Sequence, residues 1–184
     1  EMLDSDITLN GWEGKAAITE TTLSPYEGTS TLNITLVDNE WNWWGIGLEL
    51  SENENMMDYE GGYLSFMINT TYMGNLTVGF QSPGQDAVMK ITPGDYGYNN
   101  DSLWHRVIIP IDDLLSTNPD VDMTNILNPF VLMAADGAYW ESIFVDDIYW
   151  QAYPPRTIVY SETTDGEMLD SDITLNGWEG KAAI

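Results

Sequence analysis

Short segments in which apolar and polar residues alternate, each closed by turn-forming residues, most constrain the fold of this chain. Over residues 32–37, Leu, Ile and Leu alternate with Asn, Thr and Val, the period of two that is typical of a β-strand. Further strands are predicted at 46–50, 63–68, 76–80, 88–91, 104–111, 130–134 and 143–150. Gly, Pro and Asp separate these segments, and helical periodicity is nearly absent. The sequence therefore predicts an all-β protein, built as a sandwich or a barrel.

An identical repeat joins the two ends of the chain. Residues 1–18, EMLDSDITLNGWEGKAAI, recur unchanged as residues 167–184, and the two copies begin 166 residues apart. Such a repeat is expected from a tandem protein cut at an arbitrary point, or from a tail that imitates the N-terminal segment and docks into a neighbour. A cloning accident is the third explanation. The first two indicate assembly in series.

A domain boundary is predicted at residues 153–155, Tyr-Pro-Pro. Consecutive prolines cannot donate hydrogen bonds to a sheet and favour an extended connector. We therefore expect a β-sandwich domain over residues 1–153 and a linking tail over residues 154–184. The predicted linking strand comprises Thr157, Ile158, Val159, Tyr160, Ile173 and Leu175. Because a lone strand is not stable in water, this tail should pair with something.

The charge of the chain excludes several partners. Asp and Glu number 30 against 5 Lys and Arg, a net charge of −25, which repels nucleic acid and anionic membranes. Copies of the chain would also repel one another unless divalent metal or high salt screens the charge. No apolar run is long enough to span a bilayer. Sequons at Asn33, Asn69, Asn75 and Asn100 predict N-glycosylation of an exported protein, extracellular or at the cell surface.

Several motifs occur in the order of a known family. They are YEGTSTLNI at 26–34, WWGIGLEL at 43–50, YLSFMINT at 63–70, WHRVIIPIDDL at 104–114 and IFVDDIYW at 143–150. Over about residues 12–152 the chain resembles jelly-roll carbohydrate-binding modules and galactose-binding-like domains of secreted bacterial glycoside hydrolases. The resemblance implies an antiparallel β-sandwich of jelly-roll type. In that family a strand similar to TIVYSE opens the domain, whereas here this segment occurs only at 157–162.

The displaced strand has two interpretations. In the first, residues 1–155 lack their own first strand and residues 156–184 supply one to the next copy by strand addition. A tail donated head to tail makes a heterologous contact, which grows into rings or open filaments. In the second, the chain is a continuous polyprotein cut in the wrong register.

The resemblance also implies a structural calcium ion held by Glu27 and Asp146. Ca²⁺ takes oxygen ligands, which these carboxylates would supply. Alternation along the strand places Asp146 on the same side as Phe144 and Ile148, the side predicted to be apolar. A carboxylate there would need a compensating cation. The alternative is a strand-end Asp that accepts hydrogen bonds from backbone N–H groups.

Aromatic residues provide a candidate glycan site. It comprises Trp41, Tyr96, Tyr98 and Trp140. Flat rings stack against the apolar C–H faces of sugars, but large aromatics also form cores and interfaces with neighbouring copies. Trp43 and Trp44 point to opposite faces of one strand, so only one of them belongs to the core. Trp104 is predicted to lie in the core.

No catalytic site is predicted. The chain has no Cys and one His, which argues against thiolate metal sites and a histidine-based triad, and no nucleophile elbow or phosphate loop occurs. The predicted function is a non-catalytic extracellular structural module that assembles head to tail into a filament, sheath or adhesin stalk. The alternative is a carbohydrate-binding module of a secreted polysaccharide-degrading protein.

Overall fold

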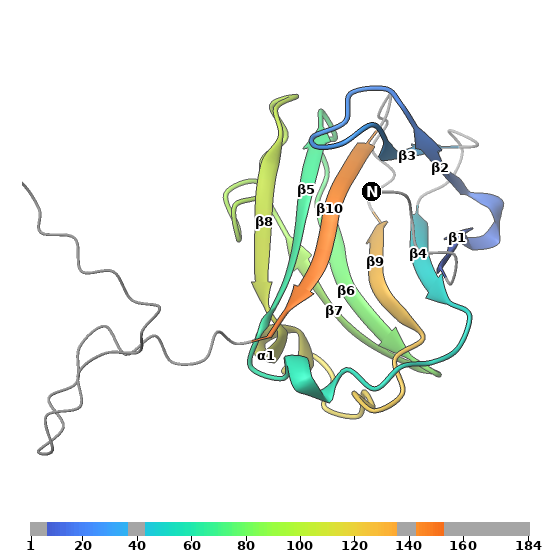
Figure 1. Cartoon of the computed structure of the whole chain (residues 1–184). Coiled ribbons are helices and arrows are strands. Elements are labelled where there is room, and N and C mark those ends of the chain that lie inside the picture. Colours follow the sequence, from blue (N-terminus) through green and yellow to red (C-terminus); the bar gives the residue numbers. More distant parts are fainter. Residues whose placement is uncertain (1–6, 37–42, 136–142, 153–184) are drawn as a thin grey trace, which may run out of the picture. The chain divides into compact units, whose positions relative to one another are not determined.

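The computed structural model describes residues 7–36, 43–135 and 143–152, which form two antiparallel sheets (Figure 1). The elements are β1 (Ile7–Gly11), η1 (Trp12–Gly14), β2 (Ala16–Thr21), β3 (Thr31–Leu36), β4 (Trp44–Leu50), η2 (Met57–Tyr59), β5 (Tyr63–Thr70), β6 (Leu76–Ser82), β7 (Gln85–Ile91), β8 (His105–Pro110), α1 (Ile111–Leu115), β9 (Asn128–Ala134) and β10 (Ile143–Gln151). Sheet A has the order β1-β4-β9-β6-β7, and sheet B the order β2-β3-β10-β5-β8. This arrangement confirms the predicted all-β sandwich.

The chain divides into two compact units, Glu1–Tyr153 and Pro154–Ile184. The predicted linking strand, Thr157 to Tyr160 with Ile173 and Leu175, belongs to the second unit and lies outside the described residues. No helix in the described part of the chain is long and apolar enough to span a membrane.

Alternate residues of each strand build the core between the sheets. In β4, Trp44, Ile46 and Leu48 are at most 4% exposed and face the other sheet. Trp44 is therefore the core member of the tryptophan pair, while Trp43 is half-buried. Phe66 of β5 meets Phe130 of β9 across the core, with ring centroids 5.1 Å apart in an edge-to-face arrangement.

The structure contains every strand predicted between residues 32 and 150 and adds β1 and β2. Those two escaped prediction because the segment from Ile7 to Thr21 carries Gly11, Gly14 and charged residues, which obscure its alternation. β1 pairs with β4 and β2 pairs with β3, and this pairing stabilises two strands that the local sequence does not indicate.

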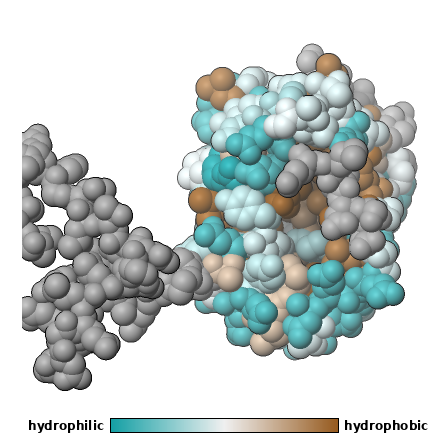
Figure 2. All heavy atoms as spheres, viewed as in Figure 1, coloured by the Kyte–Doolittle hydropathy of each residue, from teal (hydrophilic) through white to brown (hydrophobic). Residues whose placement is uncertain are grey.

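A hollow of about 830 Å³ opens between the sheets beside β10. β5 pairs with β10 from Ile143 to Gln151, but β3 pairs with it only from Ile143 to Val145. In the described residues, β10 therefore lacks a strand partner on one side after Val145. Leu32, Leu48 and Phe130 line the hollow, and Figure 2 shows hydrophobic side chains inside it.

Replacing Phe66 with Ala should remove much of the stability of this sandwich. The side chain is fully buried, so the cavity and the lost contact with Phe130 should cost about 3–5 kcal/mol in the free energy of unfolding. Urea unfolding followed by tryptophan fluorescence measures the loss. Met73→Ala is the control, because Met73 is 79% exposed and its loss should change the stability by less than about 0.5 kcal/mol. Equal stabilities of the two variants would contradict this account of the core.

Candidate functional site

The outer face of sheet A carries a row of polar side chains, one from each strand, here called the polar row. It comprises Asn10 of β1, Glu49 of β4, Asn128 of β9, Gln81 of β6 and Asp86 of β7. Asn10 Nδ2 donates a hydrogen bond to Glu49 Oε2 at 2.8 Å. Asn128 Nδ2 donates to Gln81 Oε1 at 2.8 Å, and Gln81 Nε2 donates to Asp86 Oδ1 at 2.8 Å. The polar row therefore runs across the strands, and hydrogen bonds between its members fix their side chains.

A β-bulge turns Asn128 to this outer face. Gln81 of β6 pairs with Asn128, but Gly79 pairs with Val131, so β9 contains one residue more than β6 between these pairs. Asn128 is only 5% exposed, and its Oδ1 has no hydrogen-bond partner among the described residues. An unsatisfied buried acceptor is costly. Because this oxygen is itself buried, a ligand hydroxyl would reach it only after the side chains that cover it had moved.

Trp12 lies flat on the same face. Its indole covers Gly45 and Gly47 of β4, because a Cβ at Gly45 would stand 2.4 Å from Trp12 Cε3 and one at Gly47 3.3 Å from Trp12 Cζ2. Only glycines allow this approach, and Trp12 stays half-exposed. The chain reaches this position through η1, where Glu13 and Gly14 have positive φ angles of 51° and 67°.

A second indole lies at the start of β4. Trp43 shares the parity of Gly45 and Gly47, and Lys15 Nζ lies 3.8 Å from the centroid of one of its rings. Glu13 holds the same ammonium group at 3.0 Å. The outer face of sheet A thus combines flat aromatic surfaces with a row of amides and carboxylates. Such a combination has the chemistry to contact the C–H faces and the hydroxyls of a sugar chain.

Of the four aromatic residues predicted to bind a glycan, the structure describes Tyr96 and Tyr98. Tyr98 is 1% exposed and belongs to the core, which corrects its prediction as an exposed glycan contact. Tyr96 is half-buried and donates its hydroxyl to Asp113 Oδ2 at 3.0 Å, a hydrogen bond that raises the pKa of the phenol. Trp41 and Trp140 lie outside the described residues. Trp104, predicted to be in the core, is half-buried, and its ring lies 5.8 Å from that of Tyr26 at an angle of 59°.

Asp146 lies on the other side of β10 from the one predicted. Ile143 and Val145 face the core, so Phe144 and Asp146 do not, and the alternation was assigned in the wrong phase. Asp146 Oδ2 accepts the backbone N–H of Tyr26 at 2.8 Å and that of Glu27 at 3.4 Å. Its Oδ1 accepts the N–H of Asp147 at 2.8 Å. The carboxylate thus fastens the loop between β2 and β3 to β10.

Calcium binding by Glu27 and Asp146 stays a prediction. Glu27 is exposed, and no group of three or more His, Cys, Asp or Glu side chains in the described residues could hold a metal ion. A calcium ion beside Asp146 would therefore need backbone carbonyls or waters for most of its six to eight oxygen ligands.

N-glycosylation also stays a prediction. The four acceptor residues Asn33, Asn69, Asn75 and Asn100 are all half-buried.

The sequence contained one overlooked signal for this site. In WWGIGLEL, Gly45 and Gly47 occupy the outward positions of a strand, and glycine there indicates that another group approaches closely. The partner, Trp12, lies more than thirty residues earlier and carries no sign of where it packs. The polar row is likewise invisible in the sequence, because its members become neighbours only through the strand order β1-β4-β9-β6-β7.

Asp146→Asn should loosen the loop between β2 and β3. The neutral amide accepts the N–H groups of Tyr26 and Glu27 more weakly than the carboxylate, so we expect a loss of about 1–3 kcal/mol in the free energy of unfolding. Urea unfolding with calcium and with EDTA measures it. If Asp146 also binds calcium, EDTA should lower the stability of the wild type but not of the variant. A variant as stable as the wild type in EDTA would contradict the anchoring role of the carboxylate.

Comparison with known proteins reveals one family and several structural relatives. The profile of the family described as carbohydrate binding domain 30 matches residues 3–152. The family 30 carbohydrate-binding module of the cellulosomal cellulase Cel9D-Cel44B of Clostridium thermocellum is similar at 23% identity and a TM-score of 0.61, over 78% of this chain and 89% of that chain. A second family 30 module is similar at 21% identity and a TM-score of 0.56, over 77% and 80% of the two chains.

A more distant relative has the same fold. It is the family 11 module of the cellulosomal cellulase Lic26A-Cel5E of Clostridium thermocellum, at 18% identity and a TM-score of 0.51, over 80% of this chain and 91% of that one. No curated protein matches the chain.

These matches overturn the predicted structural function. The module was predicted to assemble head to tail by strand donation, but the matching family and structures are carbohydrate-binding modules, which was the alternative prediction. The error came from the repeat of residues 1–18, because an identical sequence does not show that its copies touch. The resemblance to jelly-roll carbohydrate-binding modules and the prediction of a non-catalytic domain are confirmed.

Proposed function

The chain belongs to the carbohydrate binding domain 30 family, and from this premise we propose that its sandwich binds a polysaccharide chain on the outer face of sheet A. The single observation that carries the location is the half-exposed indole of Trp12, which lies flat over Gly45 and Gly47 beside the polar row. One sugar ring stacks on the indole. Its neighbours exchange hydrogen bonds with the amides and carboxylates.

The polar row sets the direction of the bound chain. Its members come one from each of five adjacent strands, so hydrogen-bonding groups repeat across the sheet and not along a strand. A linear glycan lying across the strands would meet a new group at each strand. Gly47, which the Trp12 indole covers, Val131, Gly79 and Val88 form a second row of outward positions beside it.

The charge of the domain favours a neutral ligand. Glu49 and Asp86 stand in the polar row, and the chain carries a net charge of −25, so a polysaccharide of uronic acids would be repelled. The hydroxyls of a neutral glucan can donate to the same carboxylates. A structural neighbour is a module of a cellulase, which supports a β-linked glucan as the ligand class. Because such polymers lie outside cells, we also propose that the protein is exported.

Trp12→Ala should abolish most of the binding to the outer face of sheet A. Truncating a tryptophan at the centre of a binding surface typically costs about 2 kcal/mol or more, roughly thirtyfold in affinity. Calorimetric titration with cellohexaose and affinity electrophoresis in hydroxyethyl cellulose measure the loss. The control Met73→Ala removes a large apolar side chain that is 79% exposed, outside this face, and should bind as the wild type does. Full binding by the Trp12 variant would move the site away from sheet A.

Gly45→Ala should weaken binding through Trp12. The added methyl group would collide with the indole, 2.4 Å from Cε3, and the ring would have to leave its position flat on β4. We expect at least tenfold weaker binding of cellohexaose, with the circular dichroism of the fold retained. In the Trp12→Ala background the same substitution should have little further effect, since the two residues act through one contact. Additive effects of the two substitutions would contradict this coupling.

A further inference from the structure

The outer face of sheet B carries a second surface of flat side chains, here called the stacked row. It comprises Trp104, Tyr26, Arg106 and Tyr149. The rings of Trp104 and Tyr26 have centroids 5.8 Å apart, and Arg106 Cζ lies 5.8 Å from the Tyr26 ring and 5.4 Å from the Tyr149 ring. Tyr26 is 40% exposed and Tyr149 is 39% exposed. Four planar groups thus follow one another over this sheet.

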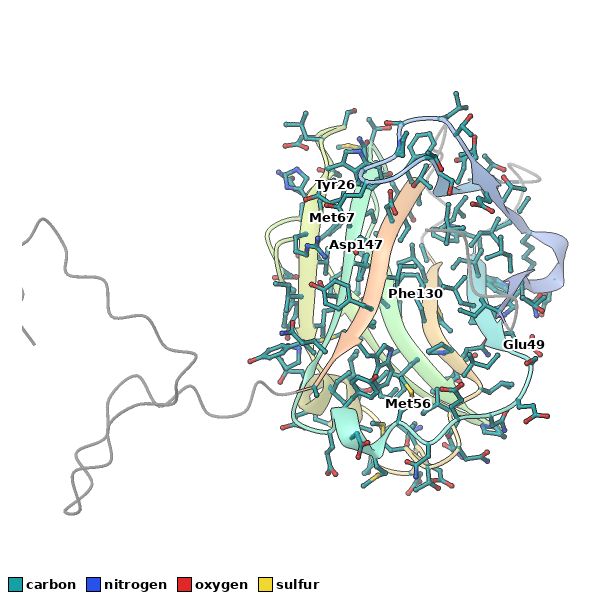
Figure 3. The ribbon with its side chains drawn as sticks, viewed as in Figure 1. Tyr26, Glu49, Met56, Met67, Phe130 and Asp147 are labelled. Carbon is teal, nitrogen blue, oxygen red and sulfur yellow. The ribbon has the colours of Figure 1, made fainter. Side chains whose placement is uncertain are left out.

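A β-bulge in β10 builds the stacked row. The pairing with β5 shifts between Asp146 and Tyr149, and Asp147 has a φ of 46°. The Asp147 carboxylate forms a salt bridge with the Arg106 guanidinium, which also donates to Ser65 Oγ at 3.3 Å. Met67 pairs with both Arg106 and Asp146 and is 4% exposed, although it lies outside the core cluster. Figure 3 shows Tyr26, Met67 and Asp147 together over β5 and β10.

The charges on this face do not favour an anionic ligand, because Arg106 is paired with Asp147 and the Asp146 carboxylate lies on the same face. Burial lowers the pKa of Arg106, but the hydrogen bond and charge of Asp147 outweigh this effect and raise the pKa above its ordinary value. The guanidinium therefore stays charged and compensates Asp147. Since the Arg106 cation is already paired, the surface does not attract an anionic polymer and suits a neutral ligand with many hydroxyls.

Two amides flank an aromatic ring on the neighbouring row of the same face. Asn33 of β3 and Asn69 of β5 pair in register with Phe144 of β10, one on each side. Asn33 Oδ1 is buried and has no hydrogen-bond partner in the part of the chain that the structure describes. Amides beside a ring supply the donors and acceptors that fix the orientation of a ligand on an aromatic surface.

We propose that the outer face of sheet B is a second binding surface for a neutral polysaccharide, centred on Tyr26, Arg106 and Tyr149. The ligand class rests on the proposed function, but the location does not, because it lies on the opposite face of the sandwich. With one chain on each sheet, the domain would bridge two polysaccharide chains and gain avidity on a bundled substrate.

The test uses the full chain, made without N-glycosylation, because glycans at Asn33 or Asn69 would stand on the same face. Calorimetric titrations with cellohexaose compare three proteins. They are the wild type, the Trp12→Ala variant and a double variant that carries both Tyr26→Ala and Tyr149→Ala. We expect two sites in the wild type and one in each variant. The viscosity of hydroxyethyl cellulose should rise only with the wild type, since only it bridges chains.

A second measurement guards against misfolding of the double variant. The Trp12→Ala variant has no substitution on sheet B. It is titrated with cellohexaose while NMR follows the indole N–H resonance of Trp104. A shift that saturates supports the second surface. If Trp104 does not respond and Trp12→Ala removes all binding, the second surface is wrong and the proposed function stands. If the wild type binds nothing, both proposals fail.

Discussion

The packing of two sheets against each other is the constraint on which the rest of this structure depends. Trp44, Ile46 and Leu48 of β4 and Phe66 of β5 face inward because their apolar area leaves water only there. Since side chains alternate along a strand, this inward set assigns every neighbouring residue to an outer face. Gly45, Gly47 and Glu49 are therefore on the outside of sheet A. The core thus positions the two proposed binding surfaces without contributing to them.

Departures from regular alternation shape both outer faces. An extra residue in β9 turns Asn128 outward to complete the polar row, and a bulge in β10 directs Asp147 toward Arg106. Bulges commonly redirect side chains next to functional sites. The positive φ of Glu13 similarly turns the chain so that Trp12 reaches β4. Each of these irregularities has a cost in backbone regularity, and each supports a side chain in one of the two surfaces.

Electrostatics distinguishes the two faces. On sheet A, two carboxylates of the polar row accept hydrogen bonds from amides, which leaves net negative charge beside the Trp12 indole. On sheet B, the Arg106 guanidinium compensates Asp147 between two tyrosine rings. Both arrangements disfavour anionic polymers, the first by repulsion and the second by offering no unpaired cation. The ligand that we propose for both faces is accordingly a neutral chain with apolar faces and many hydroxyls.

The amino-acid sequence by itself determined the class of the fold, because alternation and turn residues are local signals. Strands from β3 to β10 were predicted from segments such as 63–68 and 76–80. The alternation of side chains along a strand also predicted that one residue of the Trp43-Trp44 pair lies in the core. The motif order also identified the family resemblance.

Only the tertiary structure decided where the proposed sites lie. Trp12 meets Gly45 through strand pairing, and the phase of β10 around Asp146 depends on a bulge that no local pattern reveals. Tyr98 and Tyr26 show the same limit. Both are tyrosines in loop sequences, but Tyr98 is 1% exposed and Tyr26 is 40% exposed. Their burial differs because it depends on contacts between residues far apart in the chain.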